Sequence, residues 1–112
     1  MRRSKYNAIR TEIDGIAFDS KAEATAYSNR VLALRSGLIA DLKVHPTYPL
    51  VVNGIKIATY EADFSYLLCA TGATIVEDVK GVRTAVYRLK RKLMKAIYGI
   101  DILETSNDDL PF

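Results

Sequence analysis

The sequence predicts a single α/β domain in which two helices pack on a mixed sheet, with a small hairpin at the N-terminal end. Two stretches with apolar residues at helical spacing each begin at a Ser or Thr and end before a Gly, which are common helix boundaries. Apolar runs of strand length separate them, and Asp-Gly and Asn-Gly pairs favour tight hairpin turns. A chain of 112 residues can bury one modest core. The expected order is hairpin, helix, three strands, helix, strand.

The N-terminal part is expected to hold the hairpin and the first helix. Asp14-Gly15 suits a type I′ turn between two short strands. The helix is predicted from Ser20 to about Arg35, because Ser20 and Glu23 have the spacing of a capping box and Gly37 is a typical stop. Its expected core face consists of Ala24, Tyr27, Val31 and Leu34.

The remaining elements follow from turn residues and periodicity. His45 precedes Pro46 and is predicted to belong to a turn. The second helix is predicted from Thr84 to Tyr98 and ends at Gly99. Strands are expected at residues 48–52, 55–66, 74–80 and 100–103. The expected core stripe of the second helix is Val86, Leu89, Leu93 and Ile97.

Charge and cysteine content restrict the function classes. The net charge is +3, but bases gather at residues 1–10 and 80–95, and acids dominate residues 101–112. A basic body favours a polyanionic ligand. The one cysteine, Cys69, excludes a disulfide framework and is expected to be a small buried residue. No apolar segment has the length of a membrane span or the setting of a signal peptide, so a cytosolic protein without membrane contact is expected.

Two acids and a lysine are predicted to meet on adjacent strands. A turn centred between Ala70 and Thr71 places Asp63 directly opposite Asp78, and a centre one residue later places it opposite Lys80. Asp78 and Lys80 are two residues apart and therefore share a face of the sheet.

This arrangement favours metal chemistry. Carboxylates at one strand end can hold Mg²⁺, which activates water, while a lysine orients the nucleophile or offsets charge. The alternative is a solvated cross-strand ion pair that contributes little. Glu61 shares a face with Asp63 and is a reserve ligand. Glu77 points to the other face and is expected to be solvated or ion-paired.

Four blocks of the sequence combine with the predicted order of elements. The blocks are Phe18–Ala24, Tyr60–Phe64, Val76–Gly81 and Tyr87–Leu93. Together with the αβββαβ order, they resemble the PD-(D/E)XK nuclease superfamily, and in particular small endonuclease-like proteins of phages and prophages. The resemblance covers about residues 5–104 and implies a restriction-endonuclease-like core within a domain at residues 1–104.

The resemblance also implies roles for individual residues. Glu23, Asp63 and Asp78 would hold Mg²⁺ or Mn²⁺, and Lys80 would position the attacking water. Ala62 stands where Pro is usual, and Asp78 stands where Glu is more frequent, which shortens the ligand arm by one methylene. Glu23 remains divided between two roles, because a carboxylate folded back on the helix cap points away from a metal.

The second helix is expected to contact DNA phosphates. Residues 80–95 hold seven bases and no acid, whereas a helix face that is merely solvated, the alternative, usually mixes both signs. Such contacts hold DNA by charge and carry no sequence information. Lys90 is expected to point at the site and assist Lys80. The expected DNA-binding residues are Arg83, Arg88, Lys90, Arg91, Lys92 and Lys95.

Residues 105–112 are predicted to form a flexible acidic tail. An aromatic ring, a free carboxylate and two acids can dock in an apolar pocket with a basic rim. The end of the tail resembles the C-terminal tip of bacterial single-stranded DNA-binding proteins, which implies that host proteins that bind such tips are partners. A frayed tail and an autoinhibitory tail are the alternatives. The partner-binding residues would be Asp108, Asp109, Leu110, Pro111 and Phe112.

The predicted function is therefore a metal-dependent endodeoxyribonuclease. It would act as a homodimer on branched or junction DNA during phage recombination or replication, in the cytoplasm of a bacterial host. The alternative is a module of nuclease fold without catalysis, which binds DNA or a repair protein through its tail.

Overall fold

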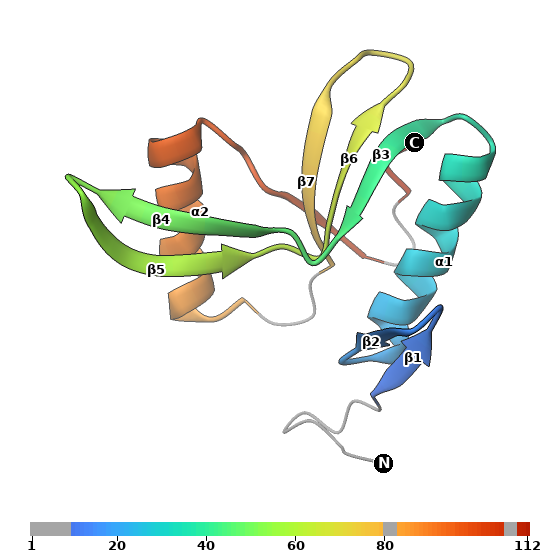
Figure 1. Cartoon of the computed structure of the whole chain (residues 1–112), viewed down its shortest axis with the longest axis horizontal. Helices are drawn as coiled ribbons and strands as arrows, with labels where there is room; N and C mark the ends of the chain where they lie inside the picture. Colours follow the sequence, from blue (N-terminus) through green and yellow to red (C-terminus); the bar gives the residue numbers. More distant parts are fainter. Residues whose placement is uncertain (1–9, 80–82, 107–109) are drawn as a thin grey trace.

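The computed structural model describes residues 10–79, 83–106 and 110–112. These residues form an α/β domain with a mixed sheet, as predicted (Figure 1). The elements are β1 (Thr11–Ile13), β2 (Ile16–Phe18), α1 (Lys21–Arg35), β3 (Ile39–Val44), β4 (Thr47–Val52), β5 (Ile55–Glu61), β6 (Phe64–Leu68), β7 (Thr74–Val79), α2 (Ala85–Tyr98) and β8 (Leu103–Thr105).

The central sheet has four strands in the order β3-β6-β7-β8. β7 and β8 are parallel, whereas the other neighbours are antiparallel. α1 and α2 lie on opposite sides of this sheet (Figure 1). The β1–β2 hairpin packs beside α1, and its turn has positive φ at both Asp14 (54°) and Gly15 (77°), which fits the predicted type I′ turn.

A long bent hairpin connects α1 to β7, and this corrects the strand predictions. The single strand expected at 55–66 is broken at Ala62 and Asp63 into β5 and β6. The partner side is broken at His45 and Pro46, so that β3, which the sequence analysis missed, precedes β4. The break does not separate the two sides, because His45 N–H donates to Asp63 O at 3.0 Å and Ala62 N–H donates to Pro46 O at 3.0 Å.

Two bulges set the register at this bend. One extra residue lies in β3 between Ala40 and Lys43, and another lies in β5 between the partners of Leu50 and Val51. Between the bulges the register is continuous, since Val44 pairs with Phe64 on one side of the bend and Thr47 pairs with Glu61 on the other. His45 therefore stands opposite Asp63.

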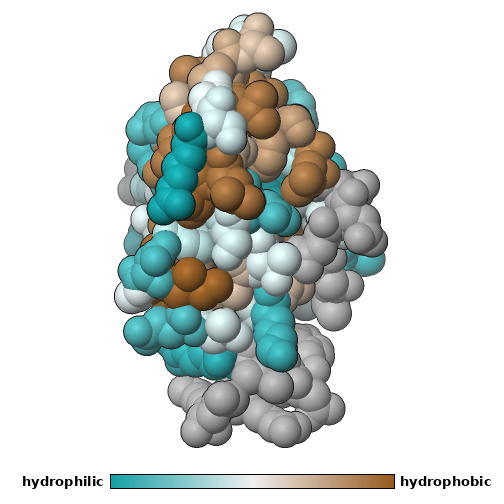
Figure 2. Space-filling view, turned by 90° about the vertical axis from the view of Figure 1, so that its right-hand side faces the viewer, coloured by the Kyte–Doolittle hydropathy of each residue, from teal (hydrophilic) through white to brown (hydrophobic). Residues whose placement is uncertain are grey.

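α1 begins and ends where predicted, and its predicted core face is buried in part: Ala24 and Tyr27 are buried and Val31 packs against the core, but Leu34 does not. Ser20 accepts a hydrogen bond from Glu23 N–H at 3.1 Å, and Gly37 has a φ of 78°. The buried residues are Ala24, Ala26, Tyr27, Arg30 and Ala33. Leu34, expected in the core, is 40% exposed, because Arg30 turns inward and the helix rotates with it. In Figure 2, brown surface gathers in the upper half, where the last turns of α1 lie, and Leu32 and Leu38 are also exposed.

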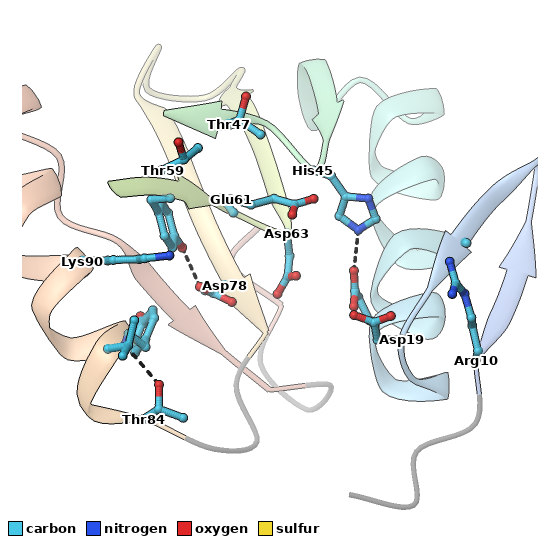
Figure 3. A pocket seen from close by; sticks show the side chains of 16 residues that line it. Arg10, Asp19, His45, Thr47, Thr59, Glu61, Asp63, Asp78, Thr84 and Lys90 are labelled. Atoms are coloured by element: carbon cyan, nitrogen blue, oxygen red, sulfur yellow. Dashed lines mark hydrogen bonds and ion pairs between the residues drawn. The ribbon is translucent and has the colours of Figure 1, made fainter. Parts of the chain in front are cut away.

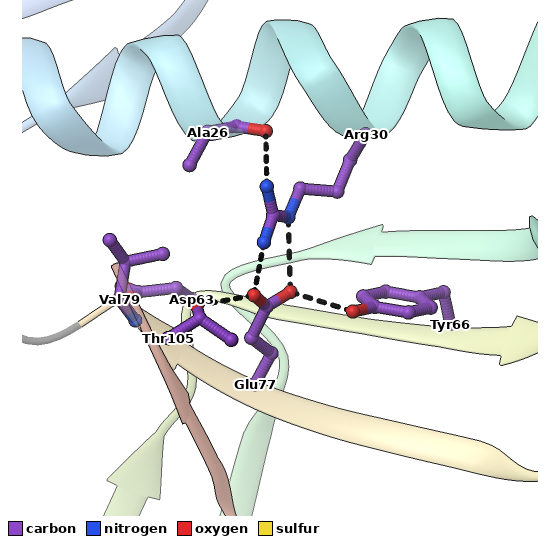
Figure 4. A network of polar contacts seen from close by, with 7 residues as sticks. All are labelled: Ala26, Arg30, Asp63, Tyr66, Glu77, Val79 and Thr105. Atoms are coloured by element: carbon purple, nitrogen blue, oxygen red, sulfur yellow. Dashed lines mark hydrogen bonds and ion pairs between the residues drawn. The ribbon is translucent and has the colours of Figure 1, made fainter. Parts of the chain in front are cut away.

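Arg30 is buried because it meets Glu77 from β7. Glu77 is fully buried and receives both the Arg30 Nε bond at 3.0 Å and a bond from Nη2 (Figure 4). Tyr66 donates to the same carboxylate at 2.9 Å and Thr105 donates at 2.5 Å. Glu77 is thus ion-paired, one of the two predicted states. A buried pair with all its polar atoms satisfied holds α1, β6, β7 and β8 together.

α2 is also capped as predicted, by Thr84 and by Gly99 with a φ of 70°. Its buried residues are Tyr87 and Met94, whereas Val86 and Leu89 of the predicted core stripe are 62% and 56% exposed. The helix is rotated because Tyr87 reaches inward and donates to Glu104 at 2.7 Å.

Two further observations concern the surface. Cys69 is exposed, contrary to expectation, because it lies just beyond the end of β6. No helix among the described residues is long and apolar enough to cross a membrane.

Candidate functional site

A pocket forms where the bend of the long hairpin meets the start of α1, the end of β7 and the side of α2 (Figure 3). Its volume is about 760 Å³. Because strand ends and one helix start converge there, it collects side chains that are far apart in the sequence. The lining side chains include Glu23, His45, Tyr60, Asp63, Asp78 and Lys90.

Asp63 and Asp78 are neighbours on adjacent strands. Phe64 pairs with Glu77, which is the register that places Asp63 opposite Asp78, the first of the two predicted registers. Asp63 Oδ2 accepts the Val79 N–H at 2.6 Å, and Asp78 Oδ2 accepts the Tyr60 hydroxyl at 2.5 Å. Successive residues of β7 point to opposite faces, so Glu77 meets α1 while Asp78 faces the pocket.

Burial and the neighbouring acids together raise the proton affinity of Asp63. Burial raises the pKa of Asp63 to about 9, with further contributions from the charge of Asp78, a hydrogen bond to Asp78 and the charge of Glu23; the Val79 N–H acts in the opposite direction. Burial and the hydrogen bond to Asp78 raise the pKa of Tyr60, which therefore remains a neutral donor. A bound cation would relieve the repulsion that now favours the protonated acid.

The backbone of Glu23 takes part in the helix cap, and its side chain is left for the pocket. Its N–H donates to Ser20 Oγ at 3.1 Å, which completes the helix cap. Its carboxylate oxygen Oε1 instead lies 2.6 Å from His45 Nε2, and Glu23 lines the pocket. The conflict between cap and ligand does not arise, because the carboxylate does not fold back on Ser20.

His45, like Tyr60, is a pocket residue to which the sequence analysis assigned no role at the site. It has a φ of 54°, which is uncommon for a residue other than glycine, and its ring lies 5.6 Å from that of Phe18. Counting from the Asn53-Gly54 turn without a bulge would pair His45 with Ala62. The bulge in β5 shifts this pairing to Asp63, and no sequence signal marked that bulge.

Three of these side chains are placed to share an ion. Glu23, His45 and Asp63 each offer a ligand atom, and these atoms lie within 4.8 Å of one another. A nitrogen and two carboxylates form a donor set that divalent metals accept in proteins. The raised pKa of Asp63 is consistent with the fit, since burial, and then the charges of Asp78 and Glu23, disfavour the bare carboxylate, which a bound cation would stabilise. Of the predicted metal ligands, Glu23 and Asp63 belong to this group, and Asp78 lies beside it.

Two lysines were predicted to assist the site, Lys80 and Lys90, and the described residues include Lys90. Lys80 lies outside the described residues. Lys90 extends from α2 into the pocket on the side of Asp78 (Figure 3). An ammonium group there brings positive charge to the edge of the acid cluster.

The basic face of α2 is partly neutralised within the chain. The Glu104 carboxylate accepts hydrogen bonds from Arg83 at 2.7 Å and from Arg91 at 3.0 Å. Lys95 donates to Asp101 at 2.9 Å. Burial raises the pKa of Glu104, but hydrogen bonds from Tyr87 and Arg83 and the charge of Arg91 outweigh it and lower that pKa. Arg88 and Lys92 are exposed on this helix.

The end of the chain lies against the core. Phe112 packs edge-on against Tyr66 with ring centroids 6.1 Å apart, and the Arg30 guanidinium lies 5.5 Å from its ring centre. Leu110 is exposed, and Asp108 and Asp109 lie outside the described residues. The prediction of a partner-binding tail is not tested by these contacts, but a partner that binds Phe112 must first displace it.

Comparison with known proteins identifies a family. A family model described as protein of unknown function DUF1064 matches residues 3–104. The chain belongs to this DUF1064 family. No curated protein and no solved structure matches the chain. The DUF1064 match contains every pocket residue from Glu23 to Lys90, whereas Phe112 lies beyond it.

Proposed function

We propose that this DUF1064 protein is a metal-dependent endodeoxyribonuclease. The observation that carries the proposal is the convergence of Glu23, Asp63 and Asp78 in one pocket, with Lys90 at its edge. Carboxylates that crowd in this way are stabilised by a divalent cation such as Mg²⁺ or Mn²⁺.

The order of elements supports a restriction-endonuclease-like core. α1, β3, β6, β7, α2 and β8 follow one another as one helix, three strands, a helix and a strand, and the β4–β5 hairpin is an extension between β3 and β6. Asp63 precedes β6 and Asp78 lies in β7, which are the positions that the PD-(D/E)XK pattern gives to its two acids. Membership of that superfamily is part of the proposal.

Individual residues of the site have proposed roles in phosphodiester hydrolysis. When bound, the metal lowers the pKa of a coordinated water and offsets charge on the phosphate. Glu23 and Asp63 hold it, with Asp78 beside them, and Tyr60 keeps the Asp78 carboxylate oriented by its hydrogen bond of 2.5 Å. Lys80 positions the water, and Lys90 supplies further positive charge at the pocket edge.

The proposal extends to partners and setting. DNA phosphates would lie along α2, where Arg88 and Lys92 are exposed, and the neighbouring bases could exchange their carboxylate partners for phosphates. A chain this small covers little duplex, so a homodimer is proposed, with branched or junction DNA as substrate. The setting proposed is the cytoplasm of a bacterial host during phage recombination or replication.

The test is cleavage of defined DNA structures. We expect the wild-type protein to cut four-way-junction or plasmid DNA with Mg²⁺ or Mn²⁺, and Asp63→Ala and Lys80→Ala each to lose at least about 100-fold in rate, since each removes charge from the reacting centre. Glu12→Gln, an exposed change in β1, serves as the matched control and should retain the rate. Equal rates for wild type and both site variants would refute nuclease activity at this pocket.

One observation favours a second candidate, a binding module without catalysis. Asp63 and Asp78 are hydrogen-bonded to each other, and the pKa of Asp63 is raised, so a shared proton can satisfy the pair with no metal present. Such a module would bind DNA or a host protein that recognises tips of single-stranded DNA-binding proteins. Calorimetry separates the two candidates, because the module requires no Mg²⁺ or Mn²⁺ uptake that depends on Asp63 and Asp78.

A further inference from the structure

His45 is held in one orientation by three independent contacts. Its backbone N–H donates to Asp63 O at 3.0 Å, and its ring lies 5.6 Å from the Phe18 ring at an angle of 58°. Its Nε2 lies 2.6 Å from Glu23 Oε1. A residue other than glycine at a φ of 54° persists only where the surrounding structure imposes it, and such positions gather at functional sites.

The chemistry of the imidazole distinguishes this pocket from one lined by acids alone. Mg²⁺ prefers oxygen ligands in a strict octahedral shell and keeps several waters, whereas imidazole nitrogen suits transition metals. His45 Nε2, Glu23 and Asp63 together offer one nitrogen and two carboxylates within 4.8 Å of one another.

From this donor set we infer that His45 is a metal ligand and that it makes the site selective for divalent transition-metal ions, Mn²⁺ among them, over Mg²⁺. The inference rests on the metal site of the proposed function and adds the class of ion that it takes. The alternative, that His45 only hydrogen-bonds Glu23, requires no nitrogen at the metal and no selectivity.

The test uses Mn²⁺ as the probe and two readouts besides cleavage. Pulsed electron paramagnetic resonance of bound Mn²⁺ detects coupling to the ¹⁴N of a directly bonded imidazole, and calorimetry gives the Kd for Mn²⁺ and for Mg²⁺. His45→Asn is the variant of choice, because Asn tolerates positive φ and removes the ring nitrogen. Glu12→Gln is the control, and thermal unfolding shows whether each variant is folded.

We expect ¹⁴N coupling in the wild type and in Glu12→Gln, and its loss in His45→Asn. The preference for Mn²⁺ over Mg²⁺ should fall at least about tenfold in that variant, because even outer-shell partners of metal ligands change affinity by about 10–100-fold. Should His45→Asn not fold, ¹⁴N coupling in the wild type alone decides the point.

The outcomes separate this inference from the function on which it rests. If Mn²⁺ binding depends on Asp63 but the bound ion shows no ¹⁴N coupling, His45 is not a metal ligand. The metal site and the nuclease proposal are then unaffected. Failure of the wild type to bind either ion overturns both. Binding of Mn²⁺ and Mg²⁺ with equal Kd, even with ¹⁴N coupling, overturns the selectivity.

Discussion

At the scale of the residue, the pocket contains a carboxylate beside other acids and a non-glycine residue with positive φ, both of which are energetically unfavourable. Asp63 is partly buried beside Asp78 and within reach of the charge of Glu23, with a backbone N–H as a favourable contact. His45 has a positive φ a few residues along from Asp41, which has the same feature at a bulge. Strained or repelling groups of this kind reduce stability and are retained where they serve a site.

Asp63→Asn should make the metal-free protein more stable at neutral and alkaline pH. The pKa of Asp63 is raised from 3.8 to about 9, so between these values the folded chain keeps a proton that the unfolded chain has released. Wild-type stability therefore falls as pH rises through this range, and Asn at position 63 removes that loss. We expect a gain of about 0.5–2 kcal/mol at pH 8 that shrinks towards pH 4.

Urea unfolding with a chelator present, at several pH values from 4 to 9, would measure this difference. Glu12→Gln again supplies the matched loss of a carboxylate. Parallel curves for wild type and Asp63→Asn across the range would show that Asp63 carries no repulsion in the folded state.

At the scale of the element, boundaries and faces behave differently. Ser20, Gly37, Thr84 and Gly99 end the helices where local rules place them, because caps depend on side chains within a few residues. The buried faces of both helices match the periodic stripes in part, since Leu34 in α1 and Val86 and Leu89 in α2 are exposed. In α2 the difference follows from Tyr87, whose hydroxyl reaches Glu104.

The rotation of α2 can be tested by a pair of truncations. Met94→Ala should cost about 2–5 kcal/mol, because Met94 is fully buried beneath the helix. Leu89→Ala should cost less than about 1 kcal/mol, because Leu89 is 56% exposed. Chemical denaturation of both variants measures the two losses, and a larger loss for Leu89 would mean that the periodic stripe, not the observed face, packs on the sheet.

At the scale of the whole molecule, Phe112 packs on the α1 side of the sheet, beside the ion pair that joins α1 to β7. The Arg30–Glu77 pair connects α1 to β7, and Phe112 packs against Tyr66 and Arg30 (Figure 4 shows the pair). The last residue therefore contributes to the same core cluster as Phe18 and Phe64. A tail that also binds a partner would exchange one apolar contact for another.

Removal of the last ring should report both roles of the tail. Phe112→Ala should lower stability by about 1–2 kcal/mol, because a partly buried aromatic ring and its contact with Tyr66 are lost. Deletion of Leu110–Phe112 should also abolish pull-down of proteins that bind tips of single-stranded DNA-binding proteins, while cleavage of DNA remains.

Leu110→Ala is the control for stability, since Leu110 is exposed. Thermal unfolding of Phe112→Ala that matches the wild type would contradict the packing role. Unchanged pull-down after the deletion would remove the partner proposal.

The sequence by itself determined the α/β class, the ends of both helices and the type of the N-terminal turn, and it reduced the pairing of Asp63 to two registers, of which the structure has the one that sets Asp63 beside Asp78. Those features depend on caps, turn residues and alternation, which act over a few residues. Tertiary structure decided which helix faces are buried and that His45 stands opposite Asp63. Two bulges shift the register of the long hairpin at its bend, and a bulge is selected by packing across strands rather than by the residues that form it.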